Sequence, residues 1–189
     1  MMNSIFELPE KGKGRRFFSQ AKETHKNTGN LLEVLLLSKR GLSRAPLARE
    51  ILRKNLASDS PGRFRIAARG TTEAYDQCPI DRRMSFACEG RGFFLEGLSR
   101  FALRPDLAQA DIIVTMDGDS DEFVRANSGS IRGQVKPFGL FLPGGSEPHL
   151  PDPFLEREDD HESHYKKLVQ SVETGCANLQ GFIVSLCSN

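Results

Sequence analysis

The stretch that decides the fold runs Val34-Leu35-Leu36-Leu37-Ser38-Lys39-Arg40-Gly41-Leu42-Ser43-Arg44-Ala45-Pro46. Its first four residues form a continuous apolar run, which is typical of a strand covered on both faces. A short polar loop follows, and Pro46 stands where a helix accepts proline in its first turn. A loop between a strand and a helix N-terminus directs backbone N–H groups toward one point, which makes it an anion site. Arg44 adds a planar guanidinium that suits phosphate oxygens.

Strand and helix signals alternate from residue 31 onward. Apolar runs predict strands at 34–37, 64–67, 112–115 and 135–138. Helical spacing of apolar residues predicts helices at 46–56, 79–89, 119–126 and 160–186, with a short helical turn at 106–109. This alternation predicts an α/β fold of three layers, in which helices flank a short four-stranded parallel sheet. Ligands of such sheets bind beyond the carboxyl ends of the strands, where the loop after residue 37 is expected.

The composition indicates one domain with a polar extension. The chain has 189 residues, of which 38% are hydrophobic, and its net charge is +1. We expect residues 1–30 to form a basic N-terminal arm and residues 31–189 to form the domain. The low net charge argues against a nucleic-acid partner, and no apolar run approaches the roughly 18 residues that span a bilayer. The four cysteines lack zinc-ligand spacing. We therefore expect a cytoplasmic protein without membrane contact, metal or cofactor.

Four further motifs follow the loop in order. They are Ala68-Arg69-Gly70-Thr71, Ala110-Asp111-Ile112-Ile113-Val114-Thr115-Met116-Asp117, Leu150-Pro151-Asp152-Pro153-Phe154, and the segment from Asp160 to Tyr165. Together with the frame from Ser38 to Pro46, they resemble the low-molecular-weight protein tyrosine phosphatases over residues 31–186. The resemblance implies a phosphotyrosine phosphatase I-like domain. It also implies that the partner is phosphate or a phosphorylated ligand, such as a phosphotyrosine protein.

The resemblance assigns roles to individual residues. Ser38 stands at the position of the nucleophile, and Asp152 at that of the general acid, which protonates the leaving group and then helps water to hydrolyse the phosphoenzyme. Arg44 would hold the phosphate oxygens together with the rest of the loop, which consists of Lys39, Arg40, Gly41, Leu42 and Ser43. We expect Asp117, at the end of a strand, to have a structural role.

The loop departs from the family pattern at positions that matter for catalysis and for phosphate binding. Ser38 replaces a cysteine, whose thiol can be ionised by loop amides and a helix N-terminus, whereas an alcohol needs a base or a metal to act as a nucleophile. Ala45 replaces a serine that supports the nucleophile. Gly41 replaces an asparagine, and glycine can adopt the same positive φ. Lys39 and Arg40 stand where the family has small or neutral residues, so the loop is expected to retain its affinity for anions.

These departures favour a catalytically impaired pseudophosphatase that binds phosphate groups without turning them over. Several departures in one loop favour natural divergence over an engineered Cys→Ser change at position 38. The alternative is an active phosphomonoesterase with Ser38 as an atypical nucleophile. An interaction protein that contacts its partner through residues 1–30 is a further alternative, whereas an arsenate reductase would need a loop cysteine that the chain lacks. The oligomeric state stays open.

Overall fold

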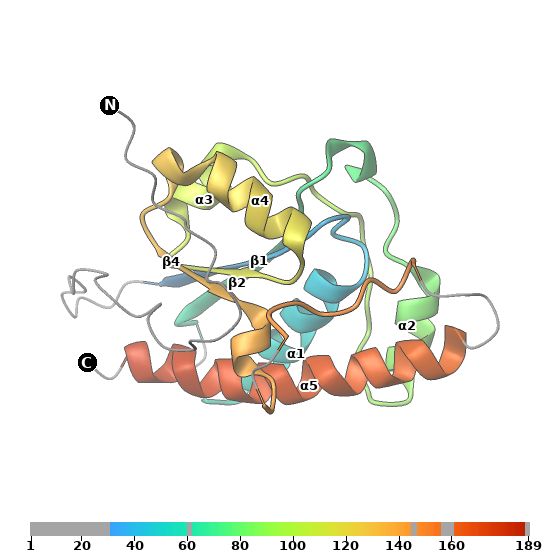
Figure 1. Ribbon diagram of the computed structural model, residues 1–189. Helices are drawn as coiled ribbons and strands as arrows, with labels where there is room; N and C mark the ends of the chain where they lie inside the picture. The colour runs from blue at the N-terminus through green and yellow to red at the C-terminus, as the bar shows by residue number, and fades with distance from the viewer. Residues whose placement is uncertain (1–30, 60–61, 145–146, 156–160, 188–189) are drawn as a thin grey trace.

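The computed structural model describes residues 31–59, 62–144, 147–155 and 161–187. Within these residues the centre of the fold is a sheet of four parallel strands in the order β2-β1-β3-β4 (Figure 1). The strands are β1 (Leu32–Ser38), β2 (Phe64–Gly70), β3 (Ile112–Thr115) and β4 (Gln134–Pro137). The predicted α/β fold with a four-stranded parallel sheet is confirmed. The arm predicted over residues 1–30 lies outside the described residues.

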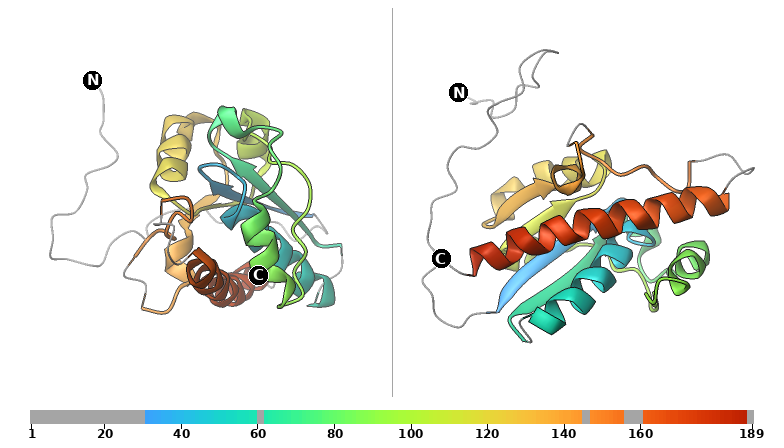
Figure 2. Two further views of the ribbon diagram at one scale, coloured as in Figure 1. Left: turned by 90° about the vertical axis from the view of Figure 1, so that its right-hand side faces the viewer. Right: turned by 90° about the horizontal axis from the view of Figure 1, so that it is seen from below.

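Helices cover both faces of the sheet. On one face lie α1 (Arg44–Asp59) and the long helix α5 (His161–Leu186), and α2 (Arg82–Glu89) packs against α5. On the other face lie α3 (Arg104–Gln109) and α4 (Gly118–Ala126), so the fold has three layers (Figures 1 and 2). Short 3-10 helices complete the described elements, at Glu73–Tyr75, Ser128–Ser130 and Phe138–Phe141.

The hydrophobic core is divided between the two faces, because successive side chains of a strand point to opposite sides. On β1, Val34 and Leu36 pack with the apolar residues of α1 and α5. Leu35 and Leu37 pack in a second cluster that includes residues of α3 and α4. The apolar run of β1 is therefore buried throughout, as its composition predicted.

Most element bounds agree with the sequence pattern, but α2 begins later than expected. The apolar spacing predicts a helix from residue 79, whereas the helix starts at Arg82. The reason is the side chain of Asp81, which accepts a hydrogen bond from the Arg83 backbone N–H and caps the helix. None of the helices in the described segments is long and apolar enough to cross a lipid bilayer.

Candidate functional site

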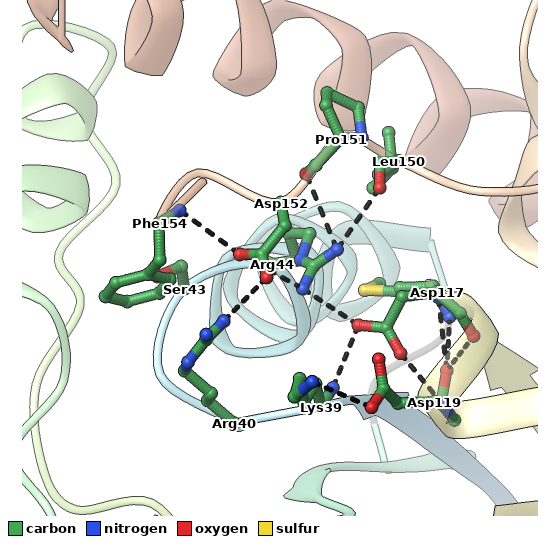
Figure 3. A network of polar contacts seen from close by, with 12 residues as sticks. Lys39, Arg40, Ser43, Arg44, Asp117, Asp119, Leu150, Pro151, Asp152 and Phe154 are labelled. Atoms are coloured by element: carbon green, nitrogen blue, oxygen red, sulfur yellow. Dashed lines mark hydrogen bonds and ion pairs between the residues drawn. The ribbon is translucent and has the colours of Figure 1, made fainter. Parts of the chain in front are cut away.

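The loop Ser38–Ser43 lies at the carboxyl edge of the sheet, between the end of β1 and the first turn of α1 (Figure 3). The ends of β2 and β3 meet it there. The Thr72 backbone N–H donates to the Lys39 carbonyl oxygen at 3.0 Å, and the Met116 N–H donates to the Leu37 carbonyl oxygen at 3.0 Å. Three strand ends thus surround the loop, at the edge where α/β sheets bind ligands.

Gly41 gives the loop a backbone conformation that other residues rarely adopt. Its φ is 67°, the positive value that was expected. A β-carbon at this position would lie 2.6 Å from the backbone nitrogen of Gly70 and 2.8 Å from Oγ of Ser99. The Ser99 hydroxyl in turn donates to the Arg40 carbonyl oxygen at 2.9 Å. The loop is therefore supported by the chain packed against it, and glycine is required at position 41.

Replacing Gly41 with alanine is expected to lower the free energy of unfolding by about 1–3 kcal/mol, because the new methyl group meets backbone atoms. Gly62→Ala is the matched control, since Gly62 also has a positive φ of 79° but open space around its Cα. Urea denaturation of both variants separates the two effects. Equal losses of stability would show that the close contact with Gly70 contributes nothing.

Several backbone N–H groups of the loop are unpaired within the described part of the chain. The Lys39 N–H donates to Oδ2 of Asp117 at 2.9 Å. The next four N–H groups, of residues 40–43, have no acceptor among the described residues. Buried backbone donors are nearly always paired in folded proteins, and residues 41–43 are buried. The loop and the N-terminus of α1 therefore carry the donors that an oxyanion requires.

Ser38 is the last residue of β1, and its side chain lacks the partners that would activate it. The residue is 2% exposed. No hydrogen bond joins its hydroxyl to a side chain elsewhere in the described residues. Ala45, which is fully buried, offers no hydroxyl to support it. An alcohol without a base remains a weak nucleophile.

Arg44 is the best-anchored charged side chain of the site. Its Nη2 lies 2.8 Å from Oδ2 of Asp117 and 3.7 Å from Oδ1 of Asp152. Its Nη1 donates to the carbonyl oxygens of Leu150 at 3.2 Å and Pro151 at 3.4 Å. Burial lowers the pKa of Arg44, and the two carboxylates partly offset that effect. These contacts hold the guanidinium beside the loop in one orientation.

Asp117 has a larger role at the site than its position at a strand end indicated. Its Oδ2 accepts the Lys39 N–H and pairs with Arg44, while its Oδ1 accepts the Ser120 N–H at 2.9 Å and caps α4. One buried carboxylate therefore joins the loop, the guanidinium of Arg44 and the start of a helix. These contacts are those of a structural residue, which is the role expected for Asp117. The sequence signal was the Asp-Gly-Asp-Ser segment, a capping pattern directly after a strand.

Asp152 pairs with Arg40. Nη1 of Arg40 lies 2.6 Å from Oδ2 of Asp152, and the Phe154 N–H donates to Oδ1 of Asp152 at 3.1 Å (Figure 3). Burial raises the pKa of the Asp152 carboxyl, but the hydrogen bonds from Arg40 and Phe154 and the charge of Arg44 together hold that pKa below its ordinary value. A general acid must carry a proton at the working pH. The contacts of Asp152 therefore disfavour the protonated form that a general acid needs.

The cations of the loop are matched by carboxylates. Nζ of Lys39 lies 2.9 Å from Oδ1 of Asp119, a pair that is partly exposed and therefore contributes little to stability. Arg40 and Arg44 pair with Asp152 and Asp117, as described above. The two additional cations thus add little net charge, because each has a carboxylate of its own. The sequence pattern did not indicate Asp119 as a partner.

Asp81 is a further site residue that the sequence pattern did not single out. Its Oδ2 accepts hydrogen bonds from the hydroxyl of Tyr165 at 2.7 Å and from the hydroxyl of Ser43 at 3.3 Å. Its Oδ1 lies 3.2 Å from Nε of Arg83. This carboxylate links the end of the loop to α2 and α5. Burial, together with the hydrogen bond to Asp81, raises the pKa of the Tyr165 phenol.

Comparison with known proteins gives the family. The family profile described as "Low molecular weight phosphotyrosine protein phosphatase" matches residues 33–186. A Synechocystis sp. protein named for the low molecular weight protein-tyrosine-phosphatases is 24% identical over 151 residues, which are 78% of this chain and 94% of that protein.

Solved structures agree with the fold. YfkJ from Bacillus subtilis has a TM-score of 0.73 at 21% identity, over 82% of this chain and 96% of its own. A Cys→Ser mutant of the arginine phosphatase YwlE, with a phosphorylated active-site serine, has a TM-score of 0.67 at 17% identity, over 81% of this chain and 96% of its own. From the extent of the profile match and the order of its motifs, the chain belongs to the low molecular weight phosphotyrosine protein phosphatase family.

Proposed function

We propose that this protein is a pseudophosphatase, which binds phosphate groups at the loop Ser38–Ser43 and does not turn them over. The observation that carries the proposal is the pairing of Asp152 with Arg40 next to a serine that, within the described residues, has no base. Binding and chemistry are separable in such a site, because the groups that hold the oxyanion are not those that attack phosphorus or protonate the leaving group.

The proposed binding of phosphate depends on the loop backbone and on Arg44. The N–H groups of residues 40–43 have no acceptor in the described part of the chain, and they precede the N-terminus of a helix of 16 residues. A helix N-terminus and successive backbone N–H groups favour an anion, and a guanidinium fork suits a phosphoryl group. The positive φ of Gly41 supports this curved backbone.

The proposed loss of catalysis depends on two side chains, those of Ser38 and Asp152. The Ser38 hydroxyl would have to attack phosphorus without a thiolate's reactivity and without a base to remove its proton. Asp152 would have to protonate the leaving group, although the Arg40 guanidinium holds its pKa low. Both steps of the family reaction are therefore impaired, while the oxyanion contacts remain.

One observation favours a second candidate, an active phosphomonoesterase that uses Ser38. In the YwlE mutant, a serine in place of the active-site cysteine carries a phosphoryl group. If Ser38 accepted a phosphoryl group, its phosphoserine would be a true intermediate only if water then hydrolysed it. Intact-mass measurement after incubation with acetyl phosphate or p-nitrophenyl phosphate, together with phosphate release, distinguishes turnover from a single transfer and from none.

The proposed function predicts that inorganic phosphate or vanadate stabilises the full chain. At 100 times the Kd, one site adds about 2.7 kcal/mol to the free energy of unfolding. For a domain of this size, the melting temperature should rise on the order of 5–10 °C. Sodium chloride at equal ionic strength is the control for general salt effects. If phosphate and vanadate shift the melting temperature no more than chloride does, the loop binds no phosphate and the proposal is wrong.

A further inference from the structure

The guanidinium of Arg40 contacts two aromatic rings. Its Cζ is 5.5 Å from the ring centroid of Tyr75 and 4.6 Å from that of Phe154, both within the range of cation–π contacts. The space beside these two rings, which the guanidinium occupies, is here called the ring slot. The guanidinium of Arg83 lies 5.2 Å from the Phe154 ring centroid and pairs with Asp81.

The ring slot adjoins the phosphate-binding loop. The carboxylate of Asp152 lies 2.6 Å from Arg40 on one oxygen and 3.7 Å from Arg44 on the other, so it separates the ring slot from the buried guanidinium. Exposure of the side chains rises outward, from 4% for Arg44 to 14% for Asp152 and 15% for Arg40. A group attached to a phosphate at Arg44 would therefore extend toward the ring slot.

We propose that Arg40 determines the ligand specificity of this site by filling the ring slot. The loop then accepts inorganic phosphate and small phosphoryl compounds, and it excludes ligands whose phosphate is attached to an aromatic ring. This inference rests on the proposed function, because it specifies which phosphate compounds the same loop binds.

Charge explains why an aromatic ring does not displace Arg40. An incoming ring could replace the contacts with Tyr75 and Phe154, but it is neutral and cannot pair with Asp152. The carboxylate would then lie near the phosphate dianion without the guanidinium of Arg40 to neutralise it, and two negative groups at short range repel each other strongly. A small oxyanion leaves Arg40 in place, so the charge of Asp152 stays neutralised. The size of the ligand and the charge of the site therefore both favour a small oxyanion over a phosphate that is attached to an aromatic ring.

The test compares two ligands on the full chain by calorimetric titration. Wild type should bind inorganic phosphate, and it should bind phenyl phosphate about tenfold or more weakly. In Arg40→Ala, the ratio of the two dissociation constants should shift toward phenyl phosphate by about tenfold or more. The ratio of the two dissociation constants is compared because the positive charge of Arg40 affects the binding of both ligands. Arg40→Ala/Asp152→Asn, which removes the carboxylate left without a partner, is the second variant if the single one does not fold.

Arg83→Ala is the matched control, because it removes another guanidinium that contacts Phe154 but pairs with Asp81 rather than with Asp152. Its ratio should equal that of wild type. The inference is wrong if wild type binds phenyl phosphate as tightly as phosphate, if Arg40→Ala leaves the ratio unchanged, or if Arg83→Ala changes it equally. If wild type binds neither ligand but Arg40→Ala binds phenyl phosphate, the proposed function fails and the role of Arg40 stands. If no variant binds either ligand, both are contradicted.

Discussion

Replacing Arg44 with alanine is expected to lower the free energy of unfolding by about 3–5 kcal/mol, the usual cost of leaving one partner of a buried ion pair alone. The side chain of Arg44 is 4% exposed, and its partner Asp117 is 10% exposed. Without the guanidinium, Asp117 keeps a buried negative charge whose remaining contacts, among the described residues, are the N–H groups of Lys39 and Ser120. The melting temperature should fall on the order of 10 °C, and stabilisation by phosphate should disappear. Urea and thermal denaturation with and without phosphate measure both effects.

The double variant Arg44→Ala/Asp117→Ala tests the cause. If the loss in Arg44→Ala comes from the unpaired carboxylate, the double variant should lose less stability than the sum of the two single variants. Arg53→Ala, an exposed arginine on the same helix, should change stability by less than about 0.5 kcal/mol. Losses that simply add would show that Arg44 and Asp117 contribute independently, contrary to their distance of 2.8 Å.

Replacing Ser38 with cysteine is expected to raise phosphatase activity well above that of the wild type. Loop amides and a helix N-terminus can lower a thiol pKa from about 8.5 to between about 3.5 and 7.5, whereas they cannot ionise an alcohol at neutral pH. The thiolate would attack phosphorus, the leaving group would depart with the bonding electrons, and water would hydrolyse the phosphocysteine. Loss of a nucleophile costs hydrolases up to about 10⁶ in kcat. We expect a gain on the order of 10³, because Ala45 and the paired Asp152 remain.

The choice of substrate makes this prediction specific. Acetyl phosphate is small and its leaving group needs no proton, so Ser38→Cys alone should hydrolyse it. Hydrolysis of p-nitrophenyl phosphate should become efficient only in Ser38→Cys/Arg40→Ala, where the ring slot is open. Phosphate release is the measurement, and Ser38→Ala is the control for contaminating activity. Equal rates in wild type and Ser38→Cys would place the defect elsewhere than at the nucleophile.

Local patterns in the sequence were sufficient for the fold and for the frame of the site. The apolar run before Ser38, the helical spacing after Pro46 and the order of the later motifs all depend on residues close together in the chain. The observed sheet and the profile match over residues 33–186 agree with them. The start of α2 was misplaced because the decisive contact is a single cap, made by Asp81, that apolar spacing does not report.

The partners of the loop cations could not be predicted in the same way. With Lys39 and Arg40 the loop was expected to retain its affinity for anions, yet Arg40 pairs with a carboxylate 112 residues away, and the Lys39 ammonium pairs with Asp119 at 2.9 Å. Such contacts depend on which strand ends become neighbours and on where the segment before α5 crosses them. No local pattern specifies them, because side-chain pairing over that distance exists only after the chain has folded.

The sequence by itself determined the fold class, the position of the loop and the serine at the family's nucleophile position, because each follows from residue types at short spacing. Only the tertiary structure decided that Asp152 pairs with Arg40, that Asp117 anchors Arg44, and that Arg40 contacts the rings of Tyr75 and Phe154. The physical reason is that a charged group's protonation and orientation depend on the charges and solvent around it, and those surroundings are assembled from distant segments.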